Sequence, residues 1–107
     1  MTWNYENRHD GPGIGGALAQ NVRVSSESLI VELVDGRTVW ASIWWYPRLV
    51  HAAPEERDKW RLIGHGEAIH WPDLDENIRV EALLAGLGSA ESQTSFGQWL
   101  KSRKGSI

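Results

Sequence analysis

Two runs of apolar and β-branched residues stand on either side of an Asp-Gly dipeptide at positions 35–36. LIVELV fills residues 29–34 and RTVWASI fills residues 37–43. Asp-Gly between two such runs predicts a β-hairpin, because both central residues of a type I′ turn need a positive φ. A two-residue turn would pair Val31 with Trp40, and both faces of the hairpin would then carry apolar side chains. We therefore expect other elements or a partner to cover both faces.

The flanking segments predict one more strand and short helices. NVRVSS, from residue 21, alternates weakly and favours a strand in front of the hairpin. Pro47 ends the second hairpin strand because proline has no N–H for the ladder, and residues 48–51 are predicted to form one helical turn. Pro54 suits the first position of a helix that we expect to run to about Trp60.

The second half of the chain predicts a strand over residues 65–71, stopped by Pro72. A short helix follows to Ala85, where Gly86 suits the C-terminal capping position, and a weaker helix is expected over about 93–103. The side chains that could cap the first of these helices are Asp73, Asp75 and Asn77. This order of elements predicts an α+β fold, in which a small antiparallel sheet (the hairpin plus one or two further strands) packs with two or three short helices.

Residues 1–20 are predicted to form a flexible lead-in, and residues 21–107 a single small domain. GPGIGGALAQ, residues 11–20, is rich in glycine and has no sustained periodicity. It matches G-x-G-x-x-G, but no strand precedes it and a proline follows its first glycine, so we expect no dinucleotide site. A chain of 107 residues has room for one hydrophobic core.

Composition and charge narrow the function classes. The chain has a formal net charge of -3 and no cysteine, so disulfides, thiolate metal sites and cysteine nucleophiles are absent. A slightly acidic chain lacks the positive field that holds proteins on nucleic acid, which makes DNA a weak candidate partner. The N-terminus has no apolar core of a signal peptide, and no apolar run approaches the ~20 residues of a membrane span. We expect a soluble cytoplasmic protein with no membrane partner.

Histidines and acidic residues gather around the last predicted strand, where a metal site has to be considered. On a strand, His65 and His70 point to opposite faces and cannot both bind one ion unless a bulge intervenes. The segment from Asp73 copies the first ligand positions of a calcium-binding EF-hand loop, but Ile78 and Leu84 stand where that loop needs Gly and Glu. We predict no metal ligand, no cofactor and no catalytic residue, so that the protein is not an enzyme.

Two other chemistries stay open. Glu67 or Asp73 beside His70 could act as a general acid–base pair, although no nucleophile stands in a recognisable motif. A basic C-terminus could contact DNA phosphates, although the chain has no helix-turn-helix or zinc-finger pattern. The basic residues concerned are Lys101, Arg103 and Lys104.

Tryptophan is abundant, with seven residues in the chain. Tryptophan brings a large apolar area and is often a hot spot of protein interfaces. Short helices cover a hairpin thinly, so we expect an exposed aromatic patch near Trp44 or Trp45. The alternative is that the C-terminal segment, through Phe96, Trp99 and Leu100, folds back and covers this patch completely. The residues predicted to bind a partner are Trp44, Trp45, Arg48 and Trp99.

A series of short motifs runs through residues 22–86. They are Asp35-Gly36-Arg37, Trp45-Tyr46-Pro47-Arg48-Leu49, Ala52 through Arg57, Gly66 through Pro72, Leu74-Asp75-Glu76 and Leu83-Leu84. In this order they resemble the bacterial family called domain of unknown function 2442. The resemblance implies a small α+β domain without established enzymatic activity, often described as an antitoxin or regulator paired with a small toxin-like protein.

The leading hypothesis is a non-catalytic protein-binding module, and the resemblance makes it the antitoxin-like partner of a small bacterial toxin in a two-gene operon. The alternative is a DNA-associated transcriptional regulator that acts as a dimer, followed by a small acid–base or metal-dependent enzyme. A homodimer stays open in either case. We expect the motifs around Arg48 and Trp71 to form one structural unit, in which Arg48 pairs with the carboxylate of Asp75 or Glu76.

Overall fold

The computed structural model describes residues 17–89 and 91–105. The lead-in was predicted to be flexible over residues 1–20, and residues 1–16 of it lie outside the described residues. The first sheet contains β1 (Ala19–Val24), β2 (Ser28–Leu33) and β3 (Thr38–Ser42), antiparallel and in that order. β1 starts before the predicted domain boundary at residue 21, and Ala19 is already buried in the core.

The β2–β3 hairpin has a three-residue turn in place of the predicted two-residue turn. The Leu33 N–H donates to the Arg37 carbonyl over 2.8 Å, and the glycine that ends the turn has φ 96°. Three-residue turns of hairpins commonly end in such a left-handed residue, which forms a bulge. The register therefore shifts by one residue, and Trp40 pairs with Ile30 rather than with Val31. The predicted pairing is wrong, and Trp40 lies on the outer face of the sheet, opposite to the core.

A second antiparallel sheet contains β4 (Arg61–Ile63), β5 (Ala68–Trp71) and β6 (Glu76–Arg79) in that order. Of these three strands only β5 lies within a predicted strand, and β6 occupies part of the segment that was expected to lead into the next helix. The backbone of Asp75 adopts φ 50° and turns the chain back, so that β6 pairs with β5. The helix after β6 has no side-chain cap. The predicted capping roles are therefore wrong for Asp73, Asp75 and Asn77.

Short helices join these strands. They are η3 (Ile43–Trp45), α1 (Pro47–Val50), α2 (Pro54–Arg57), η4 (Gly64–Gly66), η5 (Pro72–Leu74), α3 (Val80–Leu84) and α4 (Gln93–Gly105). As predicted, Gly86 terminates α3 in the left-handed conformation, with φ 76°. The Leu87 N–H donates to the Ala82 carbonyl over 3.0 Å, which completes the helix cap. α2 ends at Arg57 rather than near Trp60.

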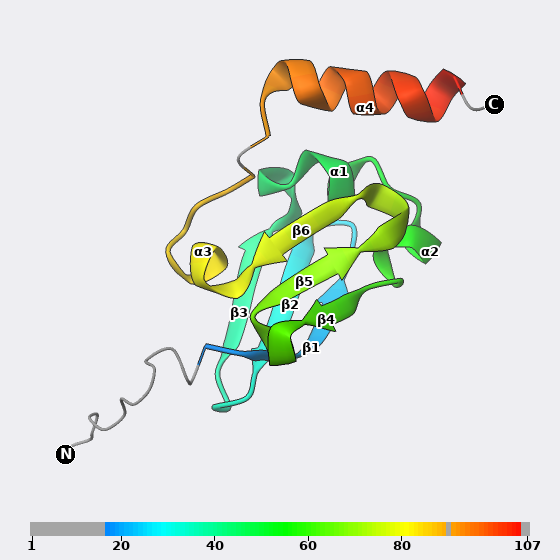
Figure 1. Ribbon diagram of the computed structural model, residues 1–107. Helices are drawn as coiled ribbons and strands as arrows, with labels where there is room; N and C mark the ends of the chain where they lie inside the picture. Colours follow the sequence, from blue (N-terminus) through cyan, green and yellow to red (C-terminus); the bar gives the residue numbers. More distant parts are fainter. Residues whose placement is uncertain (1–16, 90, 106–107) are drawn as a thin grey trace.

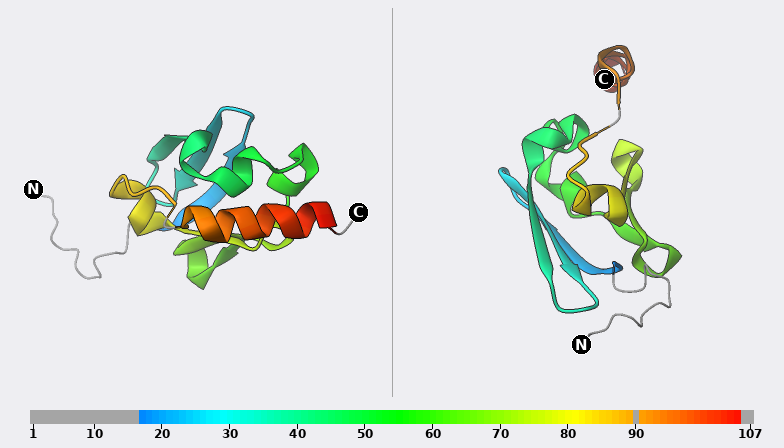
Figure 2. Two further views of the ribbon diagram at one scale, coloured as in Figure 1. Left: turned by 90° about the horizontal axis from the view of Figure 1, so that it is seen from above. Right: turned by 90° about the vertical axis from the view of Figure 1, so that its left-hand side faces the viewer.

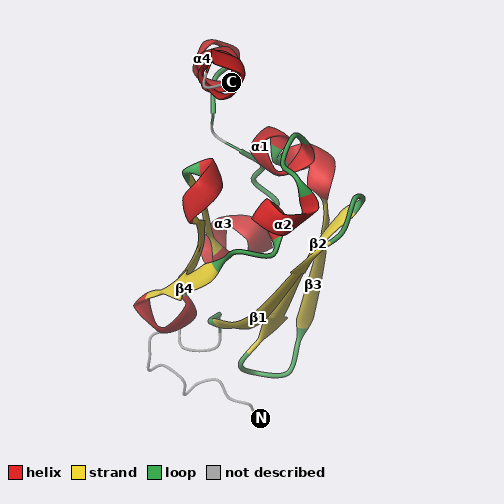
Figure 3. Ribbon diagram, turned by 90° about the vertical axis from the view of Figure 1, so that its right-hand side faces the viewer, coloured by secondary structure: helices red, strands yellow, loops and turns green. Residues whose placement is uncertain are grey.

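The helices and the two sheets enclose one core. α1 and α2 lie at one end of the sheets (Figure 1), and α4 lies beyond them as an outer layer that is joined to α3 by an extended connector (Figure 2). The two sheets face each other across the core (Figure 3). The predicted α+β class is confirmed, although the described residues form two three-stranded sheets instead of one small sheet.

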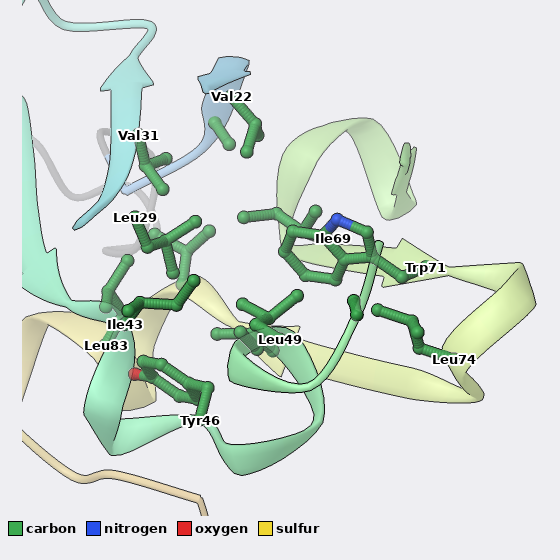
Figure 4. Close-up of a cluster of buried hydrophobic side chains, with 14 of the residues drawn as sticks. Val22, Leu29, Val31, Ile43, Tyr46, Leu49, Ile69, Trp71, Leu74 and Leu83 are labelled. Atoms are coloured by element: carbon green, nitrogen blue, oxygen red, sulfur yellow. The ribbon is translucent and has the colours of Figure 1, made fainter. Parts of the chain in front are cut away.

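Trp71 is a fully buried side chain near the middle of this core (Figure 4). Its indole N–H donates to the Arg57 carbonyl over 3.0 Å. The Arg57 guanidinium in turn donates to the carbonyls of Leu49 and Val50 at 2.9 and 3.0 Å. Other large, fully buried side chains are Leu29, Leu33, Ile43, Leu49, Ile69 and Leu74. These contacts fix α1 and α2 on the core and so set the geometry of the turn that precedes them.

Candidate functional site

The η3 turn carries two tryptophans on the surface of the domain. Its first residue, Ile43, and the residue after it, Tyr46, are buried in the core. The Ser42 hydroxyl accepts from the Trp44 N–H over 3.3 Å and caps the turn. Between these fixed points Trp44 is 72% exposed and Trp45 45% exposed. The predicted exposed aromatic patch is therefore present on a firmly anchored turn.

The connector between α3 and α4 runs beside Trp45. The Ser89 N–H donates to the Trp45 carbonyl over 3.0 Å. A Cβ atom placed on Gly88 would lie 3.6 Å from the Cβ of Trp45, which is an ordinary van der Waals distance. The connector thus covers part of Trp45 and leaves Trp44 open. The alternative in which the C-terminal segment covers the patch completely is wrong.

Arg48 of α1 joins three separate segments of the chain. Its Nε donates to the Glu91 carboxylate at 2.8 Å, and another of its nitrogens donates to the Leu74 and Asp75 carbonyls at 3.0 and 2.9 Å. The Arg48 and Glu91 side chains form an ion pair, and both are mostly buried. The predicted carboxylate partner, Asp75 or Glu76, is wrong: Asp75 contributes only its backbone carbonyl. The predicted structural unit around Arg48 does include the segment that follows Trp71.

Two guanidinium groups lie close to the ring of Trp99 in α4. The Arg48 and Arg103 guanidinium carbons lie 5.0 and 4.7 Å from its ring centroid, within the range of cation–π attraction. Arg103 also forms an ion pair with Glu56 of α2, at 2.8 Å. Arg48 and Trp99 therefore meet, but both are engaged by the chain itself. Of the four residues predicted to bind a partner, Trp44 and Trp45 are the ones that face solvent, and their role stays a prediction.

A pocket of about 430 Å³ opens between β6 and the connector to α4. Its lining mixes polar and apolar side chains, and no signal in the sequence pointed to it. Its lining includes Tyr46, Arg48, Glu76, Asn77, Ser89 and Glu91. No hydrogen bond from the described part of the chain reaches the Glu76 carboxyl. This group is thus free to contact whatever enters the pocket.

Burial dominates the electrostatics of the pocket. It raises the pKa of Glu76 from 4.5 to about 7, helped by the charges of Glu91 and Asp75 and opposed by that of Arg48. The hydrogen bond from Arg48 lowers the pKa of Glu91, and burial raises the pKa of Tyr46. Glu76 is therefore about half ionised near neutral pH, beside an ion pair that is fully charged.

The histidines and acidic residues considered as metal ligands in the sequence do not come together at one site. His70 contacts the Asn77 amide oxygen at 2.6 Å through its Nδ1, whereas His65 lies in η4 with φ 60°. Across residues 17–89 and 91–105, no three His, Asp or Glu side chains are close enough to hold a metal ion. In the same ranges, no helix is both long and apolar enough to cross a membrane.

Comparison with known proteins gives a family and a fold. The family model described as Protein of unknown function (DUF2442) matches residues 19–89. The crystal structure of a protein of unknown function from Rhodospirillum rubrum is similar, with a TM-score of 0.62 and 24% identity, over 71% of this chain and 94% of that one. The solution NMR structure of an uncharacterized protein from Chromobacterium violaceum has a TM-score of 0.58 and 21% identity, over 68% and 70% of the two chains.

These two similarities show the fold alone. Among curated proteins, none matches the chain significantly. The family model, however, spans both sheets and reaches the connector after α3. The resemblance inferred from the motifs of residues 22–86 is confirmed, and the chain belongs to the family described as Protein of unknown function (DUF2442).

Proposed function

We propose that this chain is a non-catalytic module that binds a partner protein through Trp44 and Trp45. The observation that carries the proposal is the exposure of both indole rings on a turn whose flanking residues, Ile43 and Tyr46, are buried. A rigid turn presents aromatic groups with little loss of conformational entropy on binding. Tryptophans presented in this way are typical of interface hot spots.

The finer proposal is that the partner is a small toxin-like protein encoded beside this chain, which then acts as its antitoxin. Its support is the family resemblance. An inhibitor of this kind needs to occlude a surface and needs no chemistry of its own, which suits an exposed aromatic patch. The net charge of -3 would favour encounter with a basic partner.

A DNA-associated regulator has weaker support. Binding to DNA requires cations that are available to phosphates. Arg103, near the basic end of α4, forms an ion pair with Glu56, and the mostly buried Arg48 forms one with Glu91. These two guanidinium groups are already neutralised by the chain, which reduces the field that the basic end presents to a phosphate backbone.

The pocket favours a second candidate function, an acid–base or ligand-binding site at Glu76. A half-buried carboxyl with a pKa of about 7, without a hydrogen-bond partner and in an open pocket, is a combination found in active sites. If this candidate is correct, Glu76→Gln removes turnover or ligand binding and leaves partner binding unchanged. A library of small molecules screened by NMR against the wild-type chain and this variant tests it.

The protein-binding proposal is tested by co-expression with the product of the adjacent gene. We expect a complex that survives purification, and we expect the double variant Trp44→Ala with Trp45→Ala to bind about tenfold or more weakly, since loss of a hot spot costs about 2 kcal/mol or more. Circular dichroism and thermal melting establish that the variant is folded. Ile63→Ala, which removes another exposed apolar side chain on β4, is the matched control.

Two results would overturn the proposal. One is an unchanged affinity in the folded double variant, because the tryptophans would then lie outside the interface. The other is a failure of the adjacent gene product to bind the wild-type chain, which would exclude the toxin-like partner. Loss of affinity in Ile63→Ala as well would show that the effect is not specific to the η3 turn.

A further inference from the structure

β3 is an open sheet edge within the described part of the chain, because it pairs with β2 on one side only. The hydrogen bond from the Leu33 N–H to the Arg37 carbonyl shows which alternate residues of the second hairpin strand bond to β2. Hydrogen-bonded pairs alternate along antiparallel strands, so Thr38, Trp40 and Ser42 direct their backbone groups away from β2. From the residues described, no hydrogen bond reaches the outward N–H or C=O groups of Thr38 or Trp40.

The other three edges of these sheets carry features that discourage pairing. β1 has a register break after Ala19 and carries the exposed Arg23. β4 has only three residues, and Arg61 is one of them. β6 carries the exposed Arg79 and continues directly into α3. Charges, bulges and short lengths are the devices by which proteins keep edges from pairing, and the Thr-Val-Trp-Ala-Ser sequence of β3 has none of them.

We propose that β3 pairs with β3 of a second copy of this chain, antiparallel about a twofold axis at Trp40. In this register Trp40 faces Trp40 of the second copy and Thr38 faces Ser42. The first sheets of the two copies then form one continuous sheet of six strands. This inference goes beyond the proposed function and concerns a different surface from the η3 tryptophans.

Self-complementarity is the reason for choosing a second copy as the occupant. The outward-directed residues are placed symmetrically about Trp40, so the same groups donate and accept on both copies, as a twofold interface requires. β3 contains no charged residue, so no like charges meet. It also offers no charge that would attract a strand of another protein.

Burial of Trp40 adds to the backbone pairing. This side chain is 67% exposed on the outer face of the sheet, where its neighbour on β2 is the nearly buried Ile30. Aromatic residues directly opposite each other across an antiparallel pair stabilise it. On the inner face, the half-buried Val39 and Ala41 would extend the apolar face of the neighbouring sheet. The interface uses one strand, so we expect a weak dimer.

The experiment combines sedimentation velocity with amide hydrogen exchange on the full chain. We expect a shift from monomer to dimer between about 1 µM and 1 mM, the range of a small interface. The amides of Thr38 and Trp40 should gain protection in the same range, because only the second copy can bond them. Those of Val39 and Ala41, which bond to β2, should be protected at every concentration.

Trp40→Lys should abolish the dimer, since it places two cations opposite each other, whereas Ile63→Lys on β4 should leave it intact. A chain that is monomeric at 1 mM, or a dimer in which the amides of Thr38 and Trp40 exchange freely, would overturn the proposal. So would a dimer that survives in a folded Trp40→Lys. If that variant does not fold, Thr38→Lys takes its place. None of these outcomes depends on the partner-binding test at Trp44.

Discussion

Replacing Glu76 with glutamine is expected to stabilise the protein at about pH 8 and to change its stability little at about pH 4. The Glu76 carboxyl is partly buried in the pocket, and burial raises its pKa from 4.5 to about 7. Below pH 4.5 the carboxyl is protonated in both the folded and the unfolded chain, so its ionisation does not affect the free energy of unfolding. Above it, the unfolded chain ionises freely while the folded chain holds its proton up to about pH 7.

The stability that wild-type Glu76 loses between these two pH values can be worked out. A rise of one unit in the folded-state pKa corresponds to 1.36 kcal/mol, so a rise from 4.5 to about 7 gives about 3 kcal/mol at most. The side chain is only partly buried, and the solvent that reaches it screens its interactions, so we expect about 1–2 kcal/mol in practice. Glutamine has the same shape and no charge, so the variant should not lose this stability.

Urea unfolding at a series of pH values measures the difference in free energy between wild type and Glu76→Gln. The difference should be near zero at about pH 4, grow as the pH rises and level off above about pH 7. Glu55→Gln, an exposed acid on α2, is the control and should show no such trend. A constant difference across the range, or a variant less stable than wild type at about pH 8, would refute the reasoning.

Further substitutions test the ion pair in front of α4 and the close packing of a glycine against β1. Arg48→Met should leave the mostly buried Glu91 carboxylate without its cation and lower the free energy of unfolding by about 3 kcal/mol. It should also expose Trp99, which a red shift in fluorescence would report. Adding Glu91→Gln should restore part of the stability, because no unpaired charge then remains. Gly66→Ala should cost more than about 2 kcal/mol, because its Cβ would lie 2.3 Å from the Ala19 carbonyl oxygen at φ 106°. Gly86→Ala, in open space at φ 76°, should cost about 1 kcal/mol.

The strands of the first sheet were predictable because their signals are local. Apolar alternation and the Asp-Gly dipeptide specify the hairpin, and Gly86 specifies a helix end without reference to any distant residue. The error in register shows the limit of this reasoning. Asp-Gly also suits a three-residue turn, in which Val34 joins the turn and Gly36 takes the left-handed position.

The second sheet and the pocket depend on contacts that no local pattern shows. β6 is a strand of four residues with two charged side chains, and it forms because Asp75 reverses the chain against β5. The carboxylate partner of Arg48 is 43 residues away along the chain. Asp75 and Glu76 were closer in sequence, but the chain brings Glu91 to the guanidinium instead. The raised pKa of Glu76 is a product of that same packing.

The way in which α4 is attached implies that this helix detaches from the domain more easily than the two sheets separate. None of the α4 residues whose side chains are described is fully buried, and the helix is held by the Arg103–Glu56 ion pair and by the aromatic contacts of Phe96 and Trp99. The free energy of releasing α4 is therefore smaller than that of separating the two sheets, and it falls as salt screens the ion pair. Transient release separates Trp99 from the Arg48 guanidinium while the core stays folded. In solution, the fraction of molecules in which α4 is docked on the domain would thus depend on ionic strength.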